Sequence, residues 1–114
     1  MAIQKPREKL YYSLSQVCEM TGLEPDVIKS WEKTFPQLEP VRNRSGNRLY
    51  SDRELTLIFF IREYLHRQQL PEEEVRRRIR HLDFQSPLGK KVLWQRILAE
   101  IKLEVQEIQA LFNQ

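Results

Sequence analysis

The sequence predicts a mainly α-helical protein, built as a winged helix-turn-helix with a second helix pair and a long C-terminal helix. Three observations support this prediction. Two short amphipathic segments flank a glycine turn at Gly22. An arginine-rich hairpin pattern follows at residues 40–51. Apolar residues then recur with heptad spacing over residues 90–114.

The composition is that of one small compact domain. The 114 residues are 40% hydrophobic and 31% charged, which allows a core and excludes a disordered chain. Cys18 is the only cysteine, so neither an internal disulfide nor a multi-cysteine zinc site can form. No apolar run approaches the ~20 residues of a membrane span, and the first ten residues lack the apolar core of a secretory signal. We therefore expect a cytoplasmic protein without cofactor, metal or membrane contact.

The first helix is predicted at residues 13–21. Ser13 and Gln16 have the spacing of a capping box, and Gly22 suits the left-handed residue that ends a helix. The face that we expect in the core consists of Leu14, Val17, Cys18 and Thr21. Cys18 is then a small buried residue and not a reactive thiol.

A second helix is predicted at residues 25–34, because Pro25 suits a first helical position and Pro36 prevents continuation. Its inward stripe is Val27, Ile28, Trp31 and Phe35. Its opposite, polar stripe is Asp26, Lys29, Ser30 and Lys33. Two short helices joined by a glycine-containing turn indicate a helix-turn-helix. In that motif the polar stripe is either solvated or a recognition surface.

A hairpin is predicted next, with short strands at Val41 and residues 48–50 around an Asn, Ser and Gly turn. Alternation places Arg48 and Tyr50 on the side opposite Leu49. Because Leu49 can pack on the helices, we predict that Arg48 and Tyr50 project outward.

The hairpin also concentrates the positive charge of the chain. Residues 41–53 contain Arg42, Arg44, Arg48 and Arg53 against Asp52, so four positive charges less one negative equal the whole chain's net +3. Forked arginine donors beside a recognition helix suit phosphate oxygens.

A second helix pair is predicted after the hairpin. Ser51 and Glu54 form a capping box that opens residues 52–66, and Pro71 starts a helix at 71–82. Arginines at 76–78 and 80 follow glutamates at 72–74, which favours a solvated, ion-paired face over a contact to flanking DNA. Pro87 and Gly89 predict a linker at residues 83–89.

The C-terminal helix at residues 90–114 carries a heptad seam, namely Trp94, Leu98, Ile101, Val105, Ile108 and Phe112. Burying each of these side chains is worth ~1.5–3 kcal/mol, so we expect them to be covered. A homodimer seam is the favoured interpretation, with further leucines such as Leu103 docking on the domain. The alternative is a helix folded back on its own domain. The pattern does not choose between parallel and antiparallel pairing.

The combination resembles the MerR family of bacterial transcriptional regulators over about residues 11–82. The resemblance rests on Tyr12, "SLSQV", Gly22-Leu23, Pro25, Trp31-Glu32, Phe35-Pro36-x-Leu38-x-Pro40 and Gly46-x-Arg48-x-Tyr50. It implies that Asp26, Lys29, Ser30 and Lys33 read bases in the major groove. It also implies that Tyr12, Arg42, Arg44, Arg48 and Tyr50 contact backbone phosphates. Many members have arginine where Lys29 stands, and lysine offers a point charge in place of a fork.

We therefore expect a dimeric, sequence-specific transcription regulator on pseudo-palindromic promoter DNA of the nucleoid, with RNA polymerase as a further partner. The given sequence ends soon after the seam, so we expect no built-in ligand site. The expected division is a basic tail (1–10), a DNA-binding domain (11–82), a linker (83–89) and a dimerisation helix (90–114). The alternatives are an excisionase-like DNA-bending factor and a coiled-coil interaction module. An enzyme is not expected, because His66 and His81 lack neighbouring nucleophiles.

Overall fold

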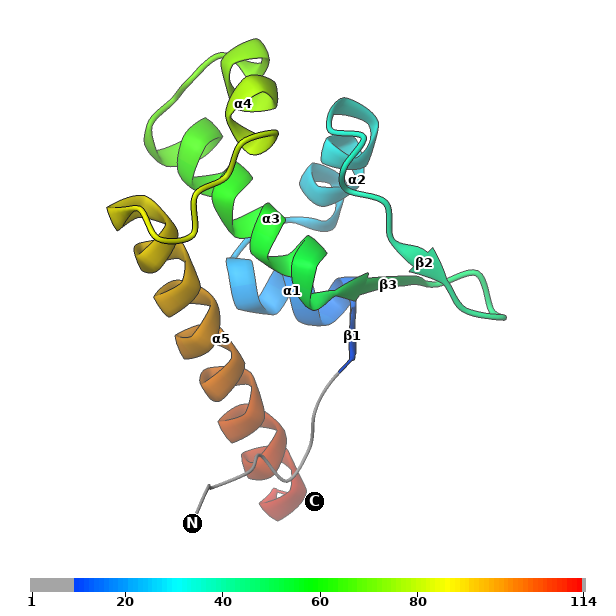
Figure 1. Ribbon diagram of the computed structural model, residues 1–114. Coiled ribbons are helices and arrows are strands. Elements are labelled where there is room, and N and C mark those ends of the chain that lie inside the picture. Colours follow the sequence, from blue (N-terminus) through cyan, green and yellow to red (C-terminus); the bar gives the residue numbers. More distant parts are fainter. Residues whose placement is uncertain (1–9, 114) are drawn as a thin grey trace.

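The computed structural model describes residues 10–113, so most of the predicted basic tail lies outside the described residues. The fold is mainly helical, with a small antiparallel sheet in which β3 lies between β1 and β2 (Figure 1). This confirms the predicted fold class. In chain order the elements are β1 (Tyr11–Ser13), α1 (Leu14–Thr21), α2 (Pro25–Thr34), β2 (Val41–Arg42), β3 (Arg48–Ser51), α3 (Asp52–Arg62), the π-helix η1 (Glu63–Arg67), α4 (Glu72–Ile79) and α5 (Pro87–Phe112).

The helix-turn-helix forms where the caps predicted it. The Gln16 N–H donates to Ser13 Oγ at 3.1 Å, and the Ser13 N–H donates to Gln16 Oε1 at 2.9 Å, which completes the capping box. Gly22 adopts φ 74°, and its N–H donates to the Cys18 carbonyl at 2.8 Å. Pro25 then occupies the start of α2. Because only glycine adopts this left-handed conformation freely, the turn between the helices is set locally.

Strand β1 was not predicted, since a segment of three residues gives no periodic signal. It pairs with β3 so that Tyr12 lies opposite Tyr50, while β2 pairs with the other edge of β3. We call the β2–β3 hairpin (residues 41–50) the wing, and its sheet receives a third strand from the segment that precedes α1. Both tyrosines are buried, so the sheet contributes to the core as well as to the surface.

Helix α3 lies at the centre of the core. Every residue from Glu54 to Ile61 is buried, which is more than the single inward stripe of Leu55, Ile58, Phe59, Arg62 and Leu65 that helical spacing in the sequence predicts. A helix that is apolar on all sides is one that its neighbours cover on all sides, and α1, α4, α5 and β3 all contact α3. Arg62 lies over the Phe59 ring and donates to the Thr21 carbonyl at 2.7 Å. Burial lowers the pKa of Arg62.

Helix α5 begins earlier than predicted and is joined to α4 by a tight turn. Ser86 caps it by accepting the Gly89 N–H at 3.0 Å, and Ser86 Oγ also donates to the Asp83 carbonyl at 2.6 Å. A Cβ on Gly89 would lie 2.3 Å from that same carbonyl oxygen. The residues predicted as a linker are thus this turn and the first turn of α5, and glycine is needed for the close approach.

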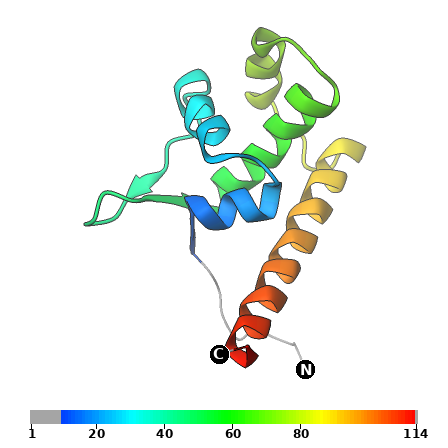
Figure 2. The ribbon, with the colours of Figure 1, turned by 180° about the vertical axis from the view of Figure 1, so that it is seen from behind.

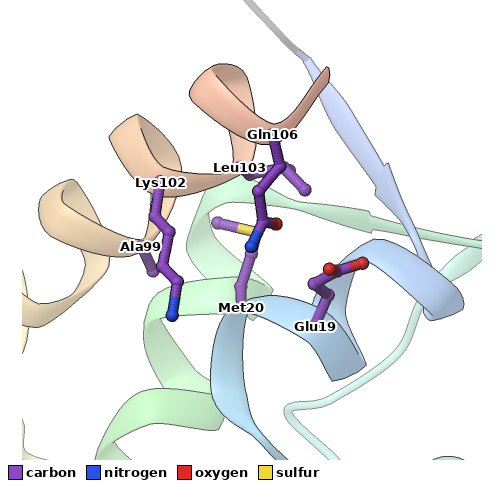
Figure 3. A pocket seen from close by; sticks show the side chains of 6 residues that line it. All are labelled: Glu19, Met20, Ala99, Lys102, Leu103 and Gln106. Carbon is purple, nitrogen blue, oxygen red and sulfur yellow. The ribbon is translucent and has the colours of Figure 1, made fainter. Parts of the chain in front are cut away.

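One face of α5 packs on the domain, and the seam face does not. Val92, Glu100 and Leu103 are buried against the rest of the chain. Figure 3 shows α5 beside α1 at a crevice of about 50 Å³, much smaller than the ~300–1,000 Å³ of ligand pockets. The seam residues Trp94, Leu98, Ile101, Val105, Ile108 and Phe112 are between 46% and 84% exposed. The helix therefore folds back on its own domain and still leaves the heptad seam uncovered.

Candidate DNA-binding surface

The polar stripe of α2 faces solvent, as predicted. Asp26, Ser30 and Lys33 are exposed and Lys29 is partly buried, while Ile28 and Trp31 fix the opposite side in the core. The Ser30 hydroxyl donates to the Val27 carbonyl at 2.7 Å, so its oxygen still has acceptor capacity toward solvent. The stripe thus offers two ammonium groups, a hydroxyl and a carboxylate on one accessible helix face.

The turn of the wing is held by its own side chains. Asn43 Oδ1 accepts the N–H groups of Ser45 and Asn47, both at 3.0 Å, and Gly46 adopts φ 82°. Arg42 donates from Nη1 to the Gly46 carbonyl at 2.8 Å. Arg44 is exposed in the turn. Figures 1 and 2 both show the wing projecting on the side away from α5, so α5 leaves this cationic loop uncovered.

A groove of about 370 Å³ lies between the wing and α2. Its lining comes from α2, the wing and the start of α1, namely Ser13, Leu14, Ser15, Lys29, Asn43, Gly46, Asn47, Arg48 and Leu49. Lys29 and the wing therefore share one concave face. The N-terminus of α1 adds the positive end of a helix dipole to it. These groups together form a cationic surface for an anionic ligand.

Of the two residues predicted to project outward, Tyr50 is buried and Arg48 is only partly exposed, at the edge of the groove. Tyr50 is fully buried, and its hydroxyl donates to Glu32 Oε2 at 2.5 Å. Arg48 Nε donates to both Glu32 carboxylate oxygens at 3.0 Å. The strand alternation was correct, but the choice of inner side was wrong, because Glu32 on α2 gives both polar groups a partner. Burial and the Glu32 carboxylate raise the pKa of Tyr50.

Tyr12 also lies away from the groove. Its side chain is 4% exposed, and its hydroxyl donates to Glu100 Oε1 on α5 at 3.0 Å. Arg96 donates to the same oxygen at 2.9 Å and reaches Asp52 at 3.2 Å. Burial, with the negative charge of Glu100, raises the pKa of Tyr12. Sequence reasoning missed Glu32 and Glu100, because each meets partners distant in the chain.

The arginines of α4 face solvent beside glutamates, as predicted. Arg78 Nε lies 3.0 Å from Glu74, Arg76 lies 3.6 Å from Glu72, and Arg77 also pairs with Glu74. A hydrogen bond from Arg78 lowers the pKa of Glu74. The positive charge of this segment is locally balanced.

A solvated helix stripe, a cationic wing and a shared groove define a winged helix-turn-helix DNA-binding domain. Residues 12–82, more than half of the chain, match the family model described as "MerR HTH family regulatory protein". The chain therefore belongs to the MerR family of helix-turn-helix regulators. Such proteins are DNA-binding transcription regulators and typically not enzymes. A sequence comparison with curated proteins found no match. No helix within residues 10–113 is long and apolar enough to span a membrane.

Proposed function

We propose that this regulator binds pseudo-palindromic promoter DNA as a homodimer, with α2 in the major groove and the wing on the phosphate backbone. The observation that carries the proposal is the groove in which Lys29 of α2 and Arg48 of the wing line the same face. A duplex lying across this groove would meet a recognition helix and a phosphate-binding loop at once.

Base reading is assigned to the exposed stripe of α2. Lys29 and Lys33 suit the acceptor atoms of guanine, and the Ser30 hydroxyl suits either a donor or an acceptor edge. Asp26 accepts hydrogen bonds, which suits the exocyclic amine of cytosine. The stripe thus favours sites rich in G·C pairs at the positions that these side chains reach.

Phosphate contact is assigned to the wing. Arg42 and Arg44 are exposed, and Arg48 lines the groove with its side chain 21% exposed. Because Tyr12 and Tyr50 are buried and donate to carboxylates, we assign them support of the wing in place of phosphate contact.

Dimer formation is assigned to the exposed seam of α5. An apolar stripe of this length is costly to leave in water, and a second copy of the same helix covers it by heptad packing. Two recognition helices related by a two-fold axis would match a pseudo-palindrome. We place RNA polymerase at the same promoter as a further partner, and we assign signal input to partner proteins or protein level in place of a built-in ligand site.

The proposal is tested by selecting bound fragments from random DNA with the purified protein and then measuring affinity by fluorescence anisotropy. The logarithm of affinity is expected to fall linearly with the logarithm of salt concentration. Replacing Lys29 by Ala should change the preferred bases. Arg44→Ala should weaken all sequences alike and reduce the salt slope by about 1. Lys90→Ala, at an exposed position on α5, serves as the control. Failure to bind any duplex at low salt would refute the proposal and leave the interaction module as the alternative.

A further inference from the structure

Glu32 is a carboxylate that contacts Arg48, one of the residues that line the groove. It lies on α2, and its side chain is 15% exposed. Three hydrogen bonds from the wing reach it, two from Arg48 Nε and one from the Tyr50 hydroxyl. We call Glu32, Arg48 and Tyr50 the Glu32 cluster. Because all three bonds cross from β3 to α2, the cluster joins the wing directly to the recognition helix.

The geometry of Arg48 leaves part of its fork available. Within residues 10–113, both side-chain hydrogen bonds of Arg48 to Glu32 use Nε, at one edge of the guanidinium plane. The same side chain lines the groove between α2 and the wing. A guanidinium carries five N–H donors in a rigid plane, so fixing the Nε edge also fixes the direction of the terminal nitrogens.

We propose that Glu32 is a positioning residue of the DNA-binding site. It holds the Nε edge of Arg48 so that Nη1 and Nη2 face a backbone phosphate, and it sets the distance between the wing and α2. This inference rests on the proposed DNA-binding function and deepens it. Glu32 itself touches no DNA in this arrangement and acts through Arg48.

Neutralising Glu32 is expected to change DNA affinity in the direction opposite to that of simple electrostatics. A carboxylate beside a duplex repels phosphate, so neutralising it should strengthen binding if charge alone matters. If Glu32 orients Arg48, neutralising Glu32 should weaken DNA binding. The guanidinium then no longer has a fixed direction, so the Arg48 side chain loses more conformational entropy when it binds a phosphate. The sign of one affinity change therefore separates the two explanations.

The experiment compares Glu32→Gln with Glu39→Gln, in the full chain and on the selected duplex. Glu39 is an exposed carboxylate on the loop between α2 and the wing, so it is a charge-matched control. Glu32→Gln is expected to bind about tenfold more weakly, the usual size of one charge-assisted hydrogen bond. It should also lower the salt slope by about 1, as the loss of one phosphate contact does. Glu39→Gln should bind as tightly as the wild type or more tightly.

A second comparison uses Arg48→Ala as the background. If Glu32 acts through Arg48, adding Glu32→Gln to Arg48→Ala should give no further loss, and removal of an unpaired carboxylate should even improve binding. Additive losses in the double variant would overturn the inference. If Glu32 had a merely structural role, Glu32→Gln would weaken binding in the Arg48→Ala background as well.

Circular dichroism checks that each variant is folded, and a titration with DNA measures the fraction of each variant that is active. Glutamine retains an acceptor for the Tyr50 hydroxyl, and Arg48→Lys provides a second variant, with the charge kept but the fork removed. Arg48→Lys is also expected to bind about tenfold more weakly. If the wild-type protein does not bind DNA at low salt, both this inference and the proposed function are overturned. Wild-type protein that binds, together with Glu32→Gln that binds equally well or better, would overturn the inference alone.

Discussion

We expect that a single charge in the middle of the proposed dimer seam would break it. Ile101 is 52% exposed in the single chain. Full burial of an isoleucine is worth ~1.5–3 kcal/mol, so covering the exposed half contributes ~1 kcal/mol per protomer and ~2 kcal/mol per dimer. Ile101→Glu loses this contribution and places two carboxylates in an apolar seam, which adds a desolvation cost. A total of at least ~3 kcal/mol raises the dimer dissociation constant by about a hundredfold or more.

Sedimentation velocity over a range of protein concentrations measures this change. The control is Ala110→Glu, which puts the same charge on an exposed position of α5, seven residues after the buried Leu103 and thus off the seam. Ile101→Glu should sediment as a monomer at concentrations where the control is dimeric, and it should lose affinity for a two-half-site duplex. Equal association of the two variants would refute the assignment of the seam. So would a wild-type protein that stays monomeric at high concentration.

Three further outcomes follow from the contacts of the fold. Gly89→Ala should lower the free energy of unfolding by ~1–3 kcal/mol in urea titrations, because its Cβ would overlap the Asp83 carbonyl. The raised pKa values of Tyr12 and Tyr50 mean that their neutral forms stabilise the fold below the ordinary tyrosine pKa of about 10; thermal unfolding should therefore show this stability disappearing as pH rises above that value. Glu100→Gln should lower the free energy of unfolding, and anisotropy should show the folded fraction binding DNA more weakly, although a negative charge has been removed.

The local parts of the fold could be predicted from the sequence because short-range chemistry determines them. The capping boxes at Ser13 and Ser51, the left-handed Gly22 and the two helices around it all depend on residues a few positions apart. The solvated stripe of α2 followed from the apolar side chains behind it. The heptad seam was also visible, since it repeats along one helix.

The orientation of β3 could not be predicted, because it depends on the contact of Tyr50 with Glu32, eighteen residues earlier in the chain. Strand alternation puts Leu49 on one face of β3 and Arg48 with Tyr50 on the other, but does not say which face is inward. We predicted that Leu49 is inward because it is the more apolar side chain. In the structure Tyr50 is inward, since its ring fills the core and Glu32 satisfies its hydroxyl. A buried polar group needs a partner, and a sequence alone does not say where the partner lies. The β1–β3 pairing was missed for the same reason.

The two tyrosines that were first assigned to phosphates connect the main functional parts of the molecule. Tyr12 and Tyr50 lie opposite each other on neighbouring strands. Tyr50 donates to Glu32 on the recognition helix, and Tyr12 donates to Glu100 on the helix that carries the seam. Cross-strand neighbours on one face pack against each other, so we expect a change at Glu100 of α5 to affect the sheet on which the wing is built. The sheet is thereby connected to α2 through Tyr50 and to α5 through Tyr12, which is why we expect the loss of either carboxylate to weaken DNA binding.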